Sequence, residues 1–151
     1  MLDQFTKDGI VVEKAIGFWI NRVYQASRGE MYRAFREQGE DVTPEQWMIL
    51  IRLWERDGPS QAELSEGTLR DAPTISRILK TMEEHGLIER RASAEDARAR
   101  AVHLTERGRR LRKKLVPVAR ALVARLTAGI EPSDVETTRR TLQRMFENVS
   151  V

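Results

Sequence analysis

The fold is decided by Asp71-Ala-Pro-Thr-Ile-Ser-Arg-Ile-Leu-Lys-Thr-Met-Glu-Glu-His85, which Gly86-Leu-Ile-Glu-Arg-Arg91 follows directly. Apolar side chains recur in the first stretch at intervals of three and four residues and therefore share one helical face, formed by Ile75, Ile78, Leu79 and Met82. The opposite face has short polar side chains near its start and the basic side chains of Arg77 and Lys80. This pattern predicts a helix with one face for a core and one for the major groove of DNA. Taken alone, a surface helix packed on any core has a similar pattern.

A short helix precedes this one, and the two have the spacing of a helix-turn-helix. Ser60-Gln-Ala-Glu63 is a capping box, which predicts a helix over Ser60–Leu69. Arg70-Asp-Ala joins it to the second helix. Asp71 or Ala72 is expected to cap the second helix, and Pro73 fixes φ just inside it. The start of that helix is therefore expected to present unsatisfied N–H groups to phosphate.

A basic β-hairpin is predicted after the second helix. Leu87–Arg91 and Ala101–Leu104 are β-competent, and the polar segment between them lacks Asn-Gly or Asp-Gly, so a loop longer than two residues is expected. Asp96 lies two residues before Arg98, a spacing at which a carboxylate can hold the guanidinium extended toward a narrow minor groove. The alternative is an exposed ion pair that contributes less than about 1 kcal/mol.

Positive charge is concentrated in one segment of the chain. The formal net charge is +3, but Arg90–Lys114 holds ten Lys/Arg and three Asp/Glu, a local charge of +7 that leaves −4 on the rest. Such a concentration is typical of a polyanion-binding site, because each neutralised phosphate releases counterions. We favour this interpretation for Arg90–Arg100. For Arg107–Lys114, a merely solvated helix face is the commoner case, and the choice is left open.

Long helices are predicted on both sides of this region. Further caps are expected at Thr43-Pro-Glu-Gln46, Thr105 and Ser133-Asp-Val-Glu136. A first helix ends near Gly39, another ends at Gly129 with a kink at Pro117, and a third closes the chain. Their apolar stripes are, in order, Ile16, Ile20, Val23, Ser27, Met31 and Ala34; Leu111, Leu115, Val118, Leu122 and Leu126; and Val135, Leu142, Met145, Phe146 and Val149.

The predicted fold is mainly α, a winged helix-turn-helix with a small β-hairpin wing and a helical dimerisation region built from N- and C-terminal helices. Its parts are residues 1–42, an N-terminal dimerisation helix; 43–106, the DNA-binding lobe; and 107–151, C-terminal dimerisation helices, in one continuous unit. Apolar stripes at both ends of a chain this small favour a bundle shared between two subunits. Packing of the two ends on each other within one chain is the alternative.

Composition narrows the function classes. The 151 residues include 32% charged residues and no cysteine, which excludes disulfides and thiolate catalysis. With no long apolar run and no signal-like segment at Met1–Ile10, we expect a soluble cytoplasmic protein with no membrane partner. No nucleophile motif, phosphate-binding glycine loop or metal signature is present, so we expect neither an enzyme nor a metal or cofactor site. His85 and His103 are interpreted as structural.

These motifs together resemble the multiple antibiotic resistance regulators, the MarR family, over nearly the whole chain. The resemblance depends on Thr43-Pro-Glu-Gln-Trp, Gln61-Ala-Glu-Leu, Thr74-Ile-Ser-Arg, Met82-Glu-Glu-His-Gly-Leu-Ile-Glu-Arg, Asp96-Ala-Arg98 and Leu104-Thr-Glu-Arg-Gly, in that order. Ser65-Glu-Gly67 departs from the family pattern. The resemblance implies a homodimeric transcriptional regulator, usually a repressor that a small aromatic or phenolic ligand releases from an inverted-repeat operator in double-stranded DNA.

The resemblance also implies roles for individual residues. Four side chains are expected in the major groove: Thr74, Ser76, Arg77 and Lys80. Arg98 is expected in the minor groove, oriented by Asp96, with Arg91 and Arg100 beside it on the wing, and Ser60 and Gln61 are expected at phosphates. The ligand pocket is expected to be lined by Trp19, Arg22, Trp47 and Ile51, although Trp19 and Trp47 as plain core residues are the favoured alternative.

Two further functions remain open from the sequence. A nonspecific architectural protein would use the same basic surface without reading a sequence. A winged-helix module for protein–protein contact would show no salt-dependent affinity for DNA, and the basic side chains of Arg77 and Lys80 count against it. A regulator of the predicted kind would be associated with the nucleoid.

Overall fold

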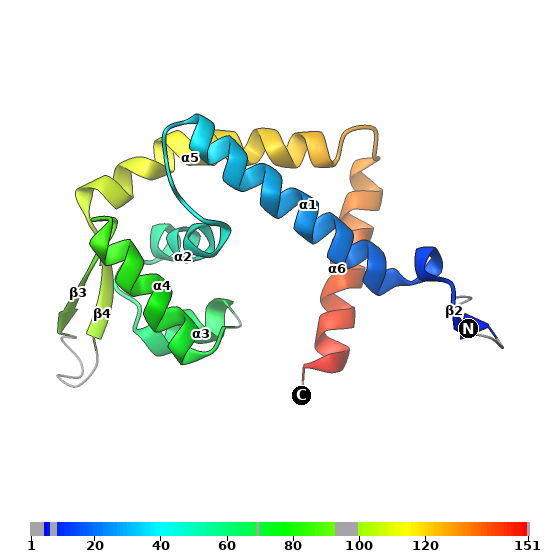
Figure 1. Cartoon of the computed structure of the whole chain (residues 1–151), viewed down its shortest axis with the longest axis horizontal. Coiled ribbons are helices and arrows are strands. Elements are labelled where there is room, and N and C mark those ends of the chain that lie inside the picture. The colour runs from blue at the N-terminus through cyan, green and yellow to red at the C-terminus, as the bar shows by residue number, and fades with distance from the viewer. Residues whose placement is uncertain (1–4, 7–8, 69, 93–99, 151) are drawn as a thin grey trace.

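The computed structural model describes residues 5–6, 9–68, 70–92 and 100–150. Six α-helices and a β-hairpin form most of the molecule (Figure 1). In chain order they are α1 (Ile16–Glu37), α2 (Pro44–Glu55), α3 (Gln61–Thr68), α4 (Ala72–Glu84), β3 (Ile88–Ala92), β4 (Arg100–Leu104), α5 (Glu106–Leu126) and α6 (Pro132–Val149). Two short strands, β1 (Phe5–Thr6) and β2 (Gly9–Ile10), and a 3₁₀ turn over Val12–Lys14 precede them. The mainly helical winged fold predicted from the sequence is confirmed.

The predicted hairpin is present. β3 and β4 pair antiparallel, with Ile88 opposite Leu104, Arg90 opposite Val102 and Ala92 opposite Arg100. The segment before α3 adds backbone hydrogen bonds on the other side of β4, because Gly58 donates to the Val102 carbonyl at 3.0 Å and the Val102 N–H donates to Pro59 at 2.9 Å. The β4 edge of the hairpin is thus attached to the backbone just before the helix-turn-helix. Asp96 and Arg98 lie outside the described residues.

Three of the predicted caps are confirmed. The side chains of Thr43 and Ser60 accept the N–H groups of Gln46 and Glu63 at 3.2 Å each, and both boxes are closed by the reciprocal bond. Thr105 accepts the N–H of Gly108 at 3.1 Å.

The cap predicted at Ser133 is wrong. α6 begins at Pro132, with Glu131 in the N-cap position and no side-chain cap bond, so Ser133 lies inside the first turn. Proline at the first helical position has the helical φ already fixed and has no N–H to satisfy, which allows the helix to start before the Ser133 box. α5 ends at Leu126, and Gly129 follows with φ +76°. α5 continues through Pro117.

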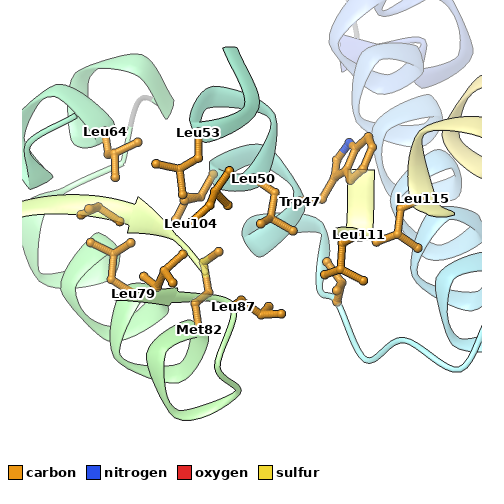
Figure 2. Close-up of a cluster of buried hydrophobic side chains, with 14 of the residues drawn as sticks. Trp47, Leu50, Leu53, Leu64, Leu79, Met82, Leu87, Leu104, Leu111 and Leu115 are labelled. Atoms are coloured by element: carbon orange, nitrogen blue, oxygen red, sulfur yellow. The ribbon is translucent and has the colours of Figure 1, made fainter. Parts of the chain in front are cut away.

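The core is centred on α2. Its buried side chains Trp47, Ile49, Leu50 and Leu53 pack among buried side chains of α1, α5 and the other helices and strands of the lobe (Figure 2). Those contributing elements supply Phe35 from α1, Leu64 from α3, Ile75, Leu79 and Met82 from α4, Leu87 and Ile88 around β3, Val102 and Leu104 from β4, and Leu111 and Leu115 from α5. One contiguous core therefore joins the winged lobe to the two long helices.

Aromatic contacts reinforce this junction. The ring of Trp47 lies 5.0 Å from that of Phe35 and 5.4 Å from that of Trp54, measured between centroids. The indole N–H of Trp54 donates to the carbonyl of Gly108 at 3.0 Å. The three rings link α1, α2 and the first turn of α5.

α1 and α5 run side by side away from the winged lobe, and α6 crosses behind α1 (Figure 1). None of the side chains of α6 is buried. The large apolar side chains exposed toward this end are Ile16, Trp19, Ile20, Val23, Val123, Leu126, Ile130, Leu142, Phe146 and Val149. Within the described ranges, each helix is too short or too polar to cross a bilayer.

Gly108→Ala is predicted to destabilise the fold. A Cβ at Gly108 would lie 2.2 Å from the carbonyl oxygen of Leu87 and 3.0 Å from a methyl group of Leu104. Because the obstacle is the backbone at the base of the wing, we expect a loss of about 1–3 kcal/mol in the free energy of unfolding.

Gly29→Ala is the matched control, since a Cβ in the middle of α1 meets no atom within 4 Å. It is expected to stabilise the protein by about 0.5–1 kcal/mol. Urea denaturation at one fixed protein concentration measures both variants. An unchanged free energy for the Gly108 variant would contradict the packing described here.

Candidate nucleic-acid interface

The start of α4 is capped by a carboxylate. Asp71 is the N-cap, and it accepts the N–H of Thr74 at 2.8 Å and the hydroxyl of Thr74 at 2.9 Å. The backbone bond from Thr74, followed by that from its hydroxyl, lowers the pKa of Asp71, and the charge of Arg77 contributes further. Asp71 is therefore ionised at neutral pH. Pro73 has no N–H and that of Thr74 is taken by Asp71, so of the first three helical residues Ala72 alone can offer its N–H to a phosphate, and that contact stays a prediction.

The outer face of α4 carries the expected DNA-reading side chains. Ile75 and Leu79 are fully buried, whereas Arg77 and Lys80 are exposed on the opposite side. Thr74 and Ser76 are half-buried, and they lie on opposite flanks because two residues turn a helix by about 200°. Lys80 lies 3.9 Å from Glu84, an exposed pair whose attraction is weak enough to give way to a phosphate.

Ser60 and Gln61 hold the helix-turn-helix together. The hydroxyl of Ser60 accepts the N–H of Glu63, and the side-chain amide of Gln61 donates to the carbonyl of Ala72 at 3.4 Å. Glu63 in turn accepts the N–H of Ser60, and this bond, followed by the bond from Arg56, lowers its pKa. Both residues thus have structural partners at the junction of α3 and α4, and their contact with phosphate stays a prediction.

The arginines of the wing differ in their surroundings. Arg91 is exposed and pairs with Glu89 on the outer face of β3. Arg100 is also exposed, but it shares the inner face with Arg90, because strand residues alternate and it pairs with Ala92. Arg90 is half-buried against Glu83 of α4. Arg91 and Arg100 are therefore available on the two faces of the hairpin.

Half of the basic stretch at the start of α5 has partners within the protein. Glu40 accepts Lys114 at 2.7 Å and lies 3.6 Å from Arg107, and Arg109 donates to Asp57 at 3.1 Å. Figure 1 shows α2 between this part of α5 and α3. These contacts favour a structural interpretation of Arg107–Lys114 over a direct role on DNA.

The four residues expected to line a ligand pocket have different surroundings in the single chain. Trp19 is 49% exposed and donates to the carbonyl of Glu13, so the alternative of a core residue is wrong for it in the single chain. The guanidinium of Arg22 lies over the ring of Phe18. Trp47 is buried in the core, and Ile51 packs partly against the same core.

Neighbouring hollows instead surround an ion pair between α1 and α2. Arg28 donates to Glu45; burial raises the pKa of Glu45, but the bonds from Arg28 and the backbone outweigh it and lower the pKa overall. A cavity of about 150 Å³ beside the pair is lined by Tyr24, Ser27, Arg28, Met31, Pro44, Glu45, Trp47, Met48 and Arg70. A second of about 210 Å³ shares Tyr24, Glu45, Met48 and Arg70 and reaches Ile75 and Ile78 of α4.

Sequence reasoning missed Tyr24, Arg28, Met48 and Arg70. For Tyr24 and Arg28 the only signal was their helical spacing with Met31 along one side of α1. That signal was obscured because Met31 was assigned to the apolar stripe predicted for the dimer. Arg70 is brought there by the turn between α3 and α4. Of the predicted pocket residues, Trp47 lines the smaller cavity.

A helix-turn-helix with a basic outer face on its second helix, followed by a hairpin with exposed arginines, defines a winged-helix DNA-binding transcriptional regulator. The family model described as MarR family matches residues 42–99, from just before α2 to just before β4. The chain is 30% identical over 132 residues to the HTH-type transcriptional repressor IacR of Pseudomonas putida, covering 87% of this chain and 78% of that protein. This chain therefore belongs to the MarR family.

Other comparisons agree. Over 98 residues the chain is 34% identical to the organic hydroperoxide resistance transcriptional regulator of Bacillus subtilis, covering 64% of this chain and 66% of that protein. A probable transcriptional regulator from Pseudomonas aeruginosa superposes with a TM-score of 0.79 at 29% identity, covering 89% of this chain and 99% of that one. CouR from Rhodococcus jostii RHA1, solved bound to p-coumaroyl-CoA, superposes with a TM-score of 0.79 at 26% identity, covering 93% of this chain and 98% of that one. The chain is a transcriptional regulator rather than an enzyme.

Proposed function

We propose that this regulator binds an inverted-repeat operator as a homodimer and acts as a repressor that an anionic aromatic molecule releases. The observation that carries the DNA-binding part is the outer face of α4, where Arg77 and Lys80 are exposed opposite fully buried Ile75 and Leu79. A regulator of this kind acts where the chromosome is, in the cytoplasm and associated with the nucleoid.

Arg77 is the side chain with the reach and position to read bases. It lies one turn after the start of α4, where a recognition helix contacts base edges. An arginine donates two parallel hydrogen bonds to a guanine, and one such contact discriminates by about 1–3 kcal/mol. Thr74 and Ser76 flank it, and Arg98 is proposed to enter the neighbouring minor groove.

Arg77→Ala is expected to weaken operator binding by about 10-fold or more, since it removes a base contact of about 1–3 kcal/mol. Arg98→Ala is expected to weaken binding strongly with the dimer intact. The operator is first selected from random duplexes by the wild-type protein, and affinities are then measured by fluorescence anisotropy at fixed salt.

Arg110→Ala is the matched control, because it removes the same charge from the exposed side of α5. Its affinity should equal that of the wild type. Selection of duplexes without a common inverted repeat would favour the architectural alternative, and no DNA binding at all would favour a protein-interaction module. Equal losses in the Arg77 and Arg110 variants would remove base reading from the proposal.

The exposed apolar end of the molecule supports the homodimer. α6 is an 18-residue helix with no buried side chain, whereas most helices in proteins are stabilised by the packing of an apolar face. Its stripe is exposed, with Phe146 at 46%, and so are apolar residues of α1 and of the end of α5. A second copy would cover these surfaces and set two winged lobes in two-fold symmetry, which matches an inverted repeat.

Phe146→Glu is expected to convert the dimer into a monomer at micromolar concentration, because it places a charge in an apolar interface. Thr137→Glu adds the same charge to the opposite side of α6 and should leave the dimer intact. Sedimentation velocity measures both. A wild-type protein that sediments as a monomer would refute the dimer, as would a Phe146 variant that remains dimeric.

The cavities beside Arg28 support an anionic effector. Apolar walls from Met31, Trp47 and Met48 surround the guanidinium of Arg28, and Arg70 adds a second cation. A carboxylate entering here can replace Glu45 as the partner of Arg28 while its ring packs on the apolar walls. The second cavity reaches Ile75 and Ile78, so a ligand there touches the helix that reads DNA.

Arg28→Met is expected to weaken binding of p-coumarate at least 10-fold by removing the cation. Arg33→Met, at an exposed position of the same helix, is the control and should bind as the wild type does. Isothermal calorimetry with p-coumarate and p-coumaroyl-CoA, with benzyl alcohol as an uncharged aromatic, measures the affinities. Binding that is equally tight in the Arg28 variant would contradict this site, and binding of neither anion would contradict the ligand class.

A further inference from the structure

A carboxylate near the end of the recognition helix clamps the wing. Glu83 of α4 accepts three hydrogen bonds from Arg90 of β3: from its backbone N–H at 3.2 Å, from Nε at 3.1 Å and from Nη2 at 2.7 Å. The side chain of Arg90 is only 19% exposed. Such a forked, charge-assisted contact fixes direction as well as distance.

The clamp is the second point at which the wing is attached to α4. The first is the tight turn between them, where Leu87 donates to the carbonyl of Met82 and Gly86 to that of Glu83. The β4 edge of the hairpin is anchored separately, by backbone bonds to Gly58 and Pro59. Arg90 lies two residues after Ile88, the first residue of β3, so its bonds to Glu83 hold the β3 edge against α4 and restrain a change of angle between the two.

We propose that the Glu83–Arg90 clamp is a positioning device that sets the angle between the wing and α4, so that one rigid lobe engages the major and the minor groove together. Glu83 is thus a positioning residue for DNA recognition and does not itself contact DNA. This proposal rests on the proposed function.

The position of Glu83 agrees with this role. On α4 it lies on the same flank as Ser76, on the side of the helix that faces the wing, while Glu84 points outward. The bond from Arg90 is the largest influence lowering the pKa of Glu83, and the charge of Arg100 on the same face of the hairpin lowers it further. The clamp is therefore charged throughout the neutral range.

The sign of the charge gives a sharp test. Glu83→Gln removes a negative charge from the DNA-binding lobe, which on long-range electrostatics alone strengthens binding to a polyanion. The positioning role predicts the opposite, an affinity for the selected inverted-repeat duplex that falls about 10-fold. Glu84→Gln is the matched control: it removes the same charge from the next residue, and its affinity should equal or exceed that of the wild type.

Footprints separate positioning from a general loss of structure. With the Glu83 variant at saturating concentration, hydroxyl-radical protection of the minor groove beside each half-site should fade. Protection of guanine N7 from methylation in the major groove should persist. Arg90→Lys keeps the charge of the wing but cannot form the fork, and it should show the same selective loss.

The outcomes distinguish the two proposals. Failure of the wild-type protein to select an inverted repeat would remove the proposed function. If the wild type binds its repeat and the Glu83 variant binds equally well or better, or loses protection in both grooves to the same extent, the positioning role is overturned. Circular dichroism and the thermal midpoint of each variant establish that it is folded. If the Glu83 variant does not fold, the same measurements on Arg90→Lys test the positioning role.

Discussion

The burial of α2 between the winged lobe and the two long helices is the constraint on which the rest of the structure depends. Trp47 contacts Phe35 of α1, and Trp54 hydrogen-bonds to the first turn of α5. Close-packed interiors transmit displacement rather than absorb it. The lobe that carries α4 and the helices proposed to form the dimer therefore move as connected parts. In the proposed dimer, the spacing of the two copies of α4 depends on how α2 packs.

Within the lobe, carboxylates hold in place the elements that are proposed to face DNA. Asp71 caps α4, Glu63 closes the cap of α3, and Glu83 holds β3. Each has a pKa lowered by its hydrogen bonds, so each keeps its charge at neutral pH. Negative charge this close to a polyanion opposes binding unless it lies beside a cation or a helix start, which is where all three lie.

Local sequence patterns were sufficient to predict the fold, whereas contacts between side chains of different elements could not be predicted from them. Periodicity placed α4 and its buried Ile75 and Leu79, and the hairpin followed from β-competent runs around a polar loop. The capping box predicted at Ser133 is absent because Pro132, one residue earlier, can itself begin a helix. Arg28 with Glu45 and Glu83 with Arg90 join residues of different elements, and nothing in their spacing distinguishes them from solvated charges. The roles of Arg77 and Arg98 on DNA came from the family resemblance, and they stay predictions.

The Arg28–Glu45 pair joins α1, one of the helices proposed to form the dimer, to α2, the centre of the core. Arg28 belongs to α1, Glu45 to the first turn of α2, and both border hollows that Arg70 and Ile78 also line. Arg70 immediately precedes the Asp71 cap, and Ile78 faces inward from α4. On the proposal made above, an anion that takes Arg28 from Glu45 frees a charge at the start of α2. Because α2 is the packed centre of the molecule, its adjustment is passed to α4 on one side and to the dimer helices on the other. A change in the spacing of the two lobes then requires no contact between effector and DNA.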